Sequence, residues 1–319
     1  MNSGRALLIC LLAVPALAHA QGFPSKPIRI IASLAPGGGL DTTTRIIAQN
    51  LQATLGQPGI VENRPGAGGG LGSEIVAKSS PDGHTLLTVS IAHAVLASAN
   101  KNLGYNPERD LVPVTVMVTA PNVLISHPSL PVKTIRELIA YASKHPGEIN
   151  YASSGSGSTS HLATEYLKLL TKIDLTHIPY KGTAPAMTDL AAGRVSMIFT
   201  AVVSAKPYVD SGRLRVLAQA GSKRAAVMPD IPTIAEAGVP GYAVDVWFAL
   251  MAPAATPRPV LERLNQAATK ILHTPDIAKK LENLGLEPIG EGLAASDAYV
   301  KSEIKKWARV VAAAKITVD

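Results

Sequence analysis

Two loops of this chain combine small residues with hydrogen-bond donors in a pattern suited to holding an anion. The first, APGGGLD (35–41), follows the apolar run IRIIASL (28–34) and leads into a helical stretch. The second, SSGSGSTS (153–160), also stands between an apolar segment and a helical one. Unpaired backbone N–H groups and the helix dipole converge at such a junction. Neither loop contains Lys or Arg, so we expect backbone and hydroxyl groups to bind the anion.

Enzymatic interpretations of these loops lack required residues. No GK followed by Ser or Thr completes a phosphate-binding loop, and the first loop does not contain GxGxxG. The second loop does not match GxSxG, because Ser154 rather than Gly precedes Ser156 by two residues. HExxH is absent from the sequence, and the eight His show no ligand spacing. We therefore expect a binding protein that is not an enzyme and needs neither cofactor nor metal.

The segments that must position these loops repeat one order of strand, loop and helix. In the first half, strands are expected at 28–34, 59–63 and 84–90, with helices at 42–56 and 71–79. In the second half, strands are expected at 149–153, 175–180 and 194–200, with helices at 161–172 and 187–193. Two βαβαβ units predict an α/β protein of two domains, each a mostly parallel sheet flanked by helices.

The division into domains follows from two extended segments. PNVLISHPSLPVKT (121–134) separates the two units, and VDVWFALMAPAATP (244–257) follows the second unit and precedes two amphipathic helical stretches. We expect 21–124 and 246–319 to form domain 1 and 125–245 to form domain 2. Two crossings make a hinge, and ligands of open α/β sheets bind beyond the carboxyl ends of the strands. A ligand cleft is therefore expected between the domains.

The first twenty residues predict export. Arg5, an apolar run and the small residues before Gln21 are typical of a secretory signal peptide cut after Ala20. The one cysteine, Cys10, lies in that signal, which excludes disulfides in the remaining chain. Residues 1–20 hold one Arg and no acidic residue, so 299 residues with a net charge of +6 remain. Lys and Arg are scattered and aromatic content is 4%, which argues against nucleic acid as a partner.

Candidate ligand-binding residues are those of the two loops and of the neighbouring strand ends. Asp41 could instead cap the first helix, Thr159 and Ser160 could cap the later one, and His161 could orient its loop or touch ligand. Arg64 is expected to pair with Glu62 or Glu74. The candidates are Pro36, Gly37, Gly38, Gly39, Leu40, Asp41, Ser90, His93, Ser154, Gly155, Ser156, Gly157, Ser158, Thr159, Gly182, Thr183 and Thr200.

Ordered motifs over essentially the whole mature chain resemble the Bug-type periplasmic receptors of tripartite tricarboxylate transporters. They include PIRIIASLAPGGGLDTTTR, GQPGIVENRPGAGGGLGSEIVAKSSPDGHTLL, INYASSGSGSTSHLA, HIPYKGTAPAMTDLAAGRV and MPDIPTIAEAGVPGY. The resemblance implies a two-domain Venus-flytrap of type II-like periplasmic binding proteins. It also implies capture of a small carboxylate between the loops 36–41 and 154–160.

The partners implied by this resemblance are a small organic, amino or aromatic acid and the membrane subunits of a tripartite tricarboxylate-type transporter. We expect a monomer that closes on its ligand in the periplasm. Docking of the closed form on a membrane sensor kinase is the alternative to transport. An exported esterase is a more distant alternative, and it needs Ser156 or Ser158 within hydrogen-bond reach of His161 and a carboxylate.

Overall fold

The computed structural model describes residues 22–99 and 103–314, which form two lobes, each a sheet with its covering helices. The sheet of the first lobe has the strand order β11-β4-β10-β3-β1-β2. β1 pairs in parallel with β2 and β3, whereas β10 runs antiparallel to β3 and β4. The strands are β1 (Ile28–Ala32), β2 (Gly59–Asn63), β3 (Thr85–Ser90), β4 (Leu111–Ala120), β10 (Val246–Pro253) and β11 (Glu287–Pro288).

The sheet of the second lobe has the order β7-β6-β8-β5-β9. Here β6 pairs in parallel with β7 and β8, as β1 does with its neighbours, and β5 is antiparallel to β8 and β9. The strands are β5 (Asn122–Ser126), β6 (Asn150–Ser153), β7 (Thr176–Pro179), β8 (Met197–Ala201) and β9 (Arg215–Gln219). The two βαβαβ units are thus confirmed, and each is the parallel half of a mixed sheet.

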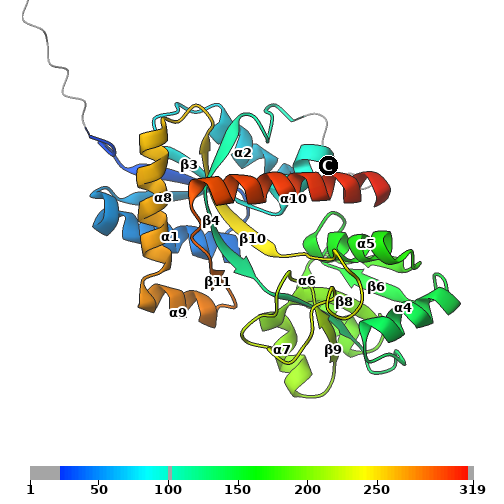
Figure 1. Cartoon of the computed structure of the whole chain (residues 1–319). Helices are drawn as coiled ribbons and strands as arrows, with labels where there is room; N and C mark the ends of the chain where they lie inside the picture. The colour runs from blue at the N-terminus through cyan, green and yellow to red at the C-terminus, as the bar shows by residue number, and fades with distance from the viewer. Residues whose placement is uncertain (1–21, 100–102, 315–319) are drawn as a thin grey trace, which may run out of the picture.

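The chain crosses between the lobes twice. β4 ends at Ala120 and β5 begins at Asn122, so Pro121 alone separates a strand of one sheet from a strand of the other. After β9 the chain returns and enters the first sheet as β10, which is hydrogen-bonded to β4. Figure 1 shows both segments running between the upper lobe and the lower one. Two adjacent crossings provide the geometry of a hinge.

Helices cover both faces of each sheet. One face of the first sheet holds α1 (Gly39–Leu55), α8 (Arg258–Leu272) and α9 (Pro275–Asn283), and the other holds the 3₁₀ turn Ala67–Gly69, α2 (Gly70–Ala77), α3 (Ala92–Ala99) and α10 (Leu293–Ala314). The second sheet lies between α4 (Ile135–Lys144) with α5 (Thr159–Thr171) and α6 (Thr183–Ala191) with α7 (Val202–Asp210). None of the described helices is long and apolar enough to cross a membrane.

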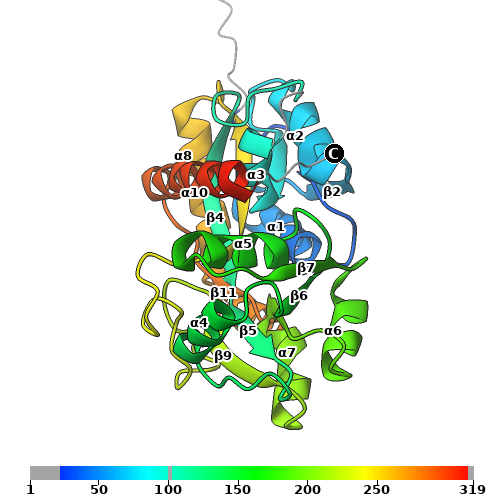
Figure 2. The same cartoon turned by 90° about the vertical axis from the view of Figure 1, so that its right-hand side faces the viewer.

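One apolar core continues from the first lobe into the second, on the side of α10. This helix packs on α3 and β4 and also reaches α5 of the other lobe, as Figures 1 and 2 show. Trp307 of α10 lies against Tyr166 of α5, with ring centroids 6.2 Å apart. The buried carboxylate of Glu303 accepts hydrogen bonds from the indole N–H groups of Trp247 and Trp307, both at 3.0 Å. Trp247 lies on β10, so α10 holds the return crossing in place.

The expected helices of the two repeated units lie within a few residues of those observed. α1 begins at Gly39 rather than Thr42, and α5 begins at Thr159 rather than His161. The sequence interpretation did not include α3, α4, α7 and α9. Residues 1–20, the expected signal peptide with Cys10, lie outside the described residues.

Candidate ligand-binding site

A cavity of about 450 Å³ lies between the lobes, next to the crossing segments. It is bounded by residues that follow the carboxyl ends of β1, β3, β6 and β8 and by the first turns of α5, α6 and α7. Ligands of open α/β sheets bind at this end of the strands. The lining residues are Leu34, Gly68, Ser90, Ile91, Ala92, Asn122, Ser154, Gly157, Ser158, Thr159, Ser160, Leu162, Thr183, Phe199, Thr200, Ala201, Ser204 and Val246.

The described residues that line this cavity carry no ionisable side chain, but they include eight hydroxyl groups and one amide. A smaller cavity of about 240 Å³ adjoins it, where Gly155 and Ser156 face Val95 and Leu96. Hydroxyl and backbone donors beside helix N-termini stabilise an anion without a cationic side chain. The arrangement is therefore suited to binding an anionic group next to an apolar one.

The loop between β6 and α5 is held by its own side chains. Ser158 is the N-cap of α5 and accepts a hydrogen bond from the backbone N–H of His161 at 3.4 Å. The Oγ of Ser160 accepts the N–H of Ser154 at 2.9 Å and lies 3.0 Å from the Oγ of Ser158. Gly157 adopts φ +74°, a conformation that glycine enters without strain. Thus Ser158, rather than Thr159 or Ser160, caps the helix.

The loop between β1 and α1 is exposed and is fastened by Asp41. The N-cap of α1 is Gly38, so the expected capping role of Asp41 is wrong. Its carboxylate instead accepts the N–H of Gly37 at 2.9 Å, the amide of Asn63 at 2.9 Å and Nε of Arg45 at 3.0 Å. Burial raises the pKa of Asp41, but these hydrogen bonds outweigh it and hold the pKa below its usual range. A charged carboxylate therefore fixes the path of the Gly-rich loop.

Behind the second loop, a nucleophile-like pair fails the requirements of a hydrolase. The Oγ of Ser153 lies 2.6 Å from Nε2 of His177, but Ser153 is fully buried and cannot reach a substrate. The Oγ of Ser158 contacts the backbone N–H of His161 and the Oγ of Ser160. The Nδ1 of the His161 ring instead accepts the N–H of Gly157. These contacts leave no serine of the loop activated by a histidine with a carboxylate behind it.

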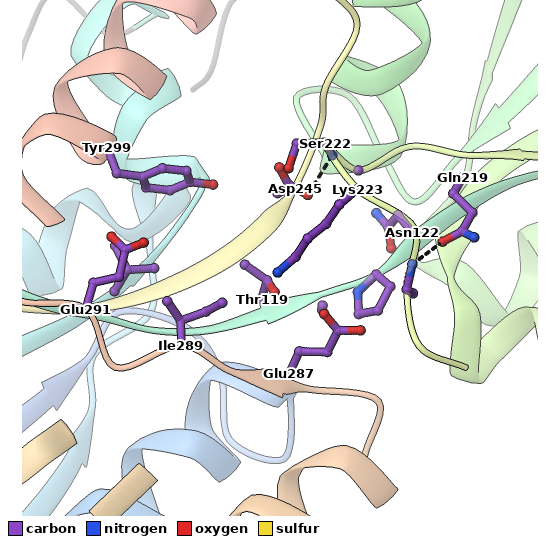
Figure 3. A pocket seen from close by; sticks show the side chains of 15 residues that line it. Thr119, Asn122, Gln219, Ser222, Lys223, Asp245, Glu287, Ile289, Glu291 and Tyr299 are labelled. Atoms are coloured by element: carbon purple, nitrogen blue, oxygen red, sulfur yellow. Dashed lines mark hydrogen bonds between the residues drawn. The ribbon is translucent and has the colours of Figure 1, made fainter. Parts of the chain in front are cut away.

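A third cavity, also of about 240 Å³, lies beside the crossing segments and has a different character (Figure 3). Lys223 of the second lobe extends into it, and Glu287, Glu291 and Tyr299 of the first lobe line it. Asp245, at the return crossing, accepts the N–H of Ser222 at 3.2 Å. No group of three or more His, Cys, Asp or Glu among the described residues could hold a metal ion.

Comparison with known proteins agrees with this architecture. A sequence profile described as "Tripartite tricarboxylate transporter family receptor" matches residues 43–316. The chain belongs to this receptor family. Protein BugT of Bordetella pertussis is 36% identical over 307 residues, which are 96% of this chain and 94% of BugT. The receptor is thus a solute-binding protein of the periplasmic binding protein class, whose members bind solutes and do not catalyse reactions.

Two solved structures of relatives contain named ligands. The first is "R. palustris Rpa4515 with adipate", which is 36% identical with a TM-score of 0.76 and covers 92% of this chain and 99% of that one. The second is "MatC (Rpa3494) from Rhodopseudomonas palustris with bound malate", which is 35% identical with a TM-score of 0.73 and covers 91% and 100%. Both relatives bind carboxylates.

The receptor brings together some of the candidate residues named from sequence and leaves others apart. Ser90, Ser154, Gly157, Ser158, Thr159, Thr183 and Thr200 line the main cavity, and Gly155 and Ser156 line the adjoining one. The described lining of these cavities does not include Pro36, Gly37, Gly38, Gly39, Leu40, Asp41, His93 or Gly182. In this conformation the first Gly-rich loop therefore stands at the exposed edge of the cleft.

His93 has a structural environment instead. Its side chain is 1% exposed on the core side of α3. Burial lowers the pKa of His93 to about 4, against the opposing effect of the Pro107 backbone. Arg64, as expected, forms an ion pair with Glu62, which also binds Arg29.

The sequence interpretation missed Asn122, Ser204 and most of the apolar wall. Asn122 is the first residue of β5, directly after the crossing at Pro121, and is 6% exposed at the cavity wall. A polar residue that opens the buried strand NVLIS was a usable signal. Ser204 lies in the first turn of α7, and its position depends on a helix that the sequence interpretation did not include.

Proposed function

We propose that this receptor is exported, loses residues 1–20, and captures a small carboxylate between its two lobes for delivery to membrane subunits of a tripartite tricarboxylate-type transporter. It acts as a monomer of two domains, for which we set the first crossing at Pro121, three residues before the expected boundary at 124, because β5 pairs with strands of the second sheet. The return crossing precedes β10, as expected from the boundary at 246. The observation that carries the proposal is the uncharged interlobe cavity, whose hydroxyl groups lie beside helix N-termini. The adipate and malate bound by two relatives support a ligand of the dicarboxylate class.

The energetics of such a site are sufficient without a cationic side chain. A hydrogen bond to a charged group contributes about 1.5–3 kcal/mol, and a helix N-terminus adds up to about 1 kcal/mol. Micromolar binding corresponds to about 8 kcal/mol. Three or four bonds from Ser90, Asn122, Ser158 and the backbone of the second loop reach that value after some loss to ordering.

Closure is expected to complete the site. The Gly-rich loop 36–39 is exposed at the edge of the first lobe, and the N-terminal turn of α1 leaves its first N–H groups without intrahelical partners. Rotation about the two crossings would bring these donors toward a ligand already seated on the second loop. A ligand that contacts both loops only in the closed state shifts the population to that state.

A thermal-shift screen of ligand-stripped mature protein against C4 to C6 diacids, amino acids, tricarboxylates, benzoates and nicotinate tests this function. Ligand at 100 times its Kd stabilises the protein by about 2.7 kcal/mol. For large domains this corresponds to roughly 5–10 °C in Tm. If no carboxylate raises Tm and a sugar, a cation or a neutral amide does, the assigned ligand class is wrong.

Two controls sharpen the test. The dimethyl ester or the diamide of a binding diacid should lose most of the affinity, because the hydrogen bonds are made to the charged form. An ester that binds equally well would contradict recognition of a carboxylate. Mass spectrometry of protein recovered from the periplasm should show an N-terminus at Gln21, and retention of residues 1–20 would contradict the proposed export signal.

A further inference from the structure

Two stacked histidines lie directly behind the second ligand loop. The rings of His161, on α5, and His177, on β7, are nearly parallel at 5°, with centroids 4.0 Å apart. Tyr151 of β6 also stacks on His177, with ring centroids 4.8 Å apart. None of the three lines the cavities described above, so they do not belong to the ligand-contacting wall.

Each histidine holds one end of the loop. Nδ1 of His161 accepts the backbone N–H of Gly157 at 3.0 Å. Nε2 of His177 lies 2.6 Å from the Oγ of Ser153, and that hydroxyl also meets the N–H of Gly155 at 3.2 Å and its carbonyl at 3.1 Å. The loop 153–157 is therefore bonded to the histidine stack at both ends, while Gly157 and Ser158 face the ligand cavity.

We propose that His161 and His177 are positioning residues that set the ligand-binding geometry of the second loop, and that their joint neutrality makes ligand affinity fall in acid. The effect on affinity rests on the proposed function, because it needs the carboxylate ligand. The hydrogen bonds that order the loop do not involve that ligand. His161 accepts through Nδ1, so its single ring proton lies on Nε2. Protonation of Nδ1 turns the acceptor into a donor that opposes the N–H of Gly157.

The surroundings keep both rings neutral at pH 7. Burial, followed by the neighbouring His161, lowers the pKa of His177 to about 4. Burial also lowers the pKa of His161, with Glu165 opposing the shift and Lys168 adding to it. Glu165 is itself engaged, since it accepts the hydroxyl of Tyr151 at 2.6 Å and Nζ of Lys168 at 2.8 Å. Two imidazolium rings at this separation would repel each other, so acid disrupts the stack and the loop together.

The direction of the pH effect follows from these shifts. Above the ordinary histidine pKa of about 6.5 both rings are neutral whether or not the loop is ordered, and affinity is constant. As the pH falls below that value, the two histidine rings take up protons when the loop is disordered, but they stay neutral when the loop is ordered. Affinity is therefore lost progressively as the pH approaches 4, the value at which His177 protonates in place.

Substitutions at His161 separate hydrogen bonding from packing. His161→Asn places an amide oxygen near the position of Nδ1 and cannot titrate, so it keeps the acceptor. His161→Leu fills similar space without an acceptor. His145→Gln is the matched control, because His145, the C-cap of α4 in the same lobe, also stacks on a tyrosine, at 4.3 Å from Tyr141, but pairs with Glu148 in the loop after α4.

The first measurement uses the ligand-free receptor at pH 7. Hydrogen exchange of the Gly157 amide, by NMR or mass spectrometry, should accelerate about two- to tenfold in His161→Leu, as expected for loss of one hydrogen bond. The amide should keep native protection in His161→Asn and His145→Gln. Equal protection in the Leu and Asn variants would overturn the positioning role. This result does not depend on which ligand the receptor binds.

The second measurement is calorimetric titration with adipate from pH 7.5 to 4.5. Carboxyl groups of the ligand titrate near pH 4 to 5, and their protonation lowers the affinity of the native receptor and of His161→Asn alike. The native receptor should lose about tenfold more affinity across the range than His161→Asn, and His145→Gln should follow the native curve. Identical curves for native and His161→Asn would overturn the pH dependence. If His161→Leu does not fold, this comparison still decides the role of His161.

Failure of the two proposals can be told apart. If the native receptor binds none of the screened carboxylates at pH 7.5, the ligand assignment fails, while exchange of the Gly157 amide still tests the histidine pair. If adipate binds but all variants behave alike, the function stands and the positioning role is wrong. His177→Gln, which retains a polar group near Nε2, should protect Ser153 and Gly155 better than His177→Leu.

Discussion

Replacement of Glu303 by alanine should strongly destabilise the receptor, because this carboxylate is the common acceptor of two buried indoles. Glu303 is 4% exposed, and its Oε2 accepts Nε1 of Trp247 and Nε1 of Trp307 at 3.0 Å each. Both indoles are fully buried. Lys306 forms an ion pair with the same carboxylate and donates to the carbonyl of Ala243 at 2.9 Å. The substitution therefore removes the hydrogen bond between α10 and Trp247 of the return crossing.

The magnitude follows from what remains buried. Two indole N–H groups left without acceptors cost about 1–3 kcal/mol each, and removing one partner of a buried ion pair costs about 3–5 kcal/mol in all. We expect a loss near 4 kcal/mol for Glu303→Ala. With roughly 2–4 °C per kcal/mol in large domains, Tm should fall by about 8–16 °C.

Differential scanning calorimetry of the mature protein measures this change. Glu303→Gln is the matched control, because its amide oxygen still accepts from both indoles and only the charge opposite Lys306 is lost. It should cost roughly 1–2 kcal/mol. A Tm drop below about 3 °C for Glu303→Ala, or equal drops for Ala and Gln, would refute the reasoning that orphaned indole donors dominate.

Two further predictions concern the ligand cleft, with adipate as the titrated probe. Gly38→Val should leave Tm within a few degrees, since an added Cβ meets no atom within 4 Å, yet reduce affinity at least tenfold if the first loop closes on the ligand. Unchanged affinity would place the ligand away from that loop. Asn122→Ala should weaken binding by about tenfold, and Asn122→Asp by more, because its carboxylate would repel the ligand. An Asp variant that binds as tightly as native would contradict an anionic ligand in contact with residue 122.

The local elements around the two loops could be predicted from sequence because their signals are local. The apolar runs, the Gly-rich breaks and the helical periodicity each occupy a few consecutive residues, and the same order occurs twice. β2 spans 59–63 as expected, and β3 and β6 begin one residue later than expected. The hydroxyl-rich second loop was assigned to the cleft on the same grounds, and most of its residues line it.

Elements without a local signal were missed for a physical reason. β5 is a run of five residues that pairs antiparallel with β8 and β9, partners more than seventy residues away. Its place in the second sheet depends on that pairing rather than on its own pattern. The mixed character of both sheets, and the position of Asn122 at the cavity wall, follow from the crossing at Pro121.

By itself the sequence determined the repeated units, the two donor-rich loops and the family of receptors to which the chain belongs. The tertiary structure decided which of those donors share one cavity. It showed Asp41 fastening a loop rather than capping a helix, and it brought His177 onto His161 and Ser153 from a neighbouring strand. Such contacts join residues whose separation in sequence carries no periodic pattern. They arise only when the packed sheets and helices place them together.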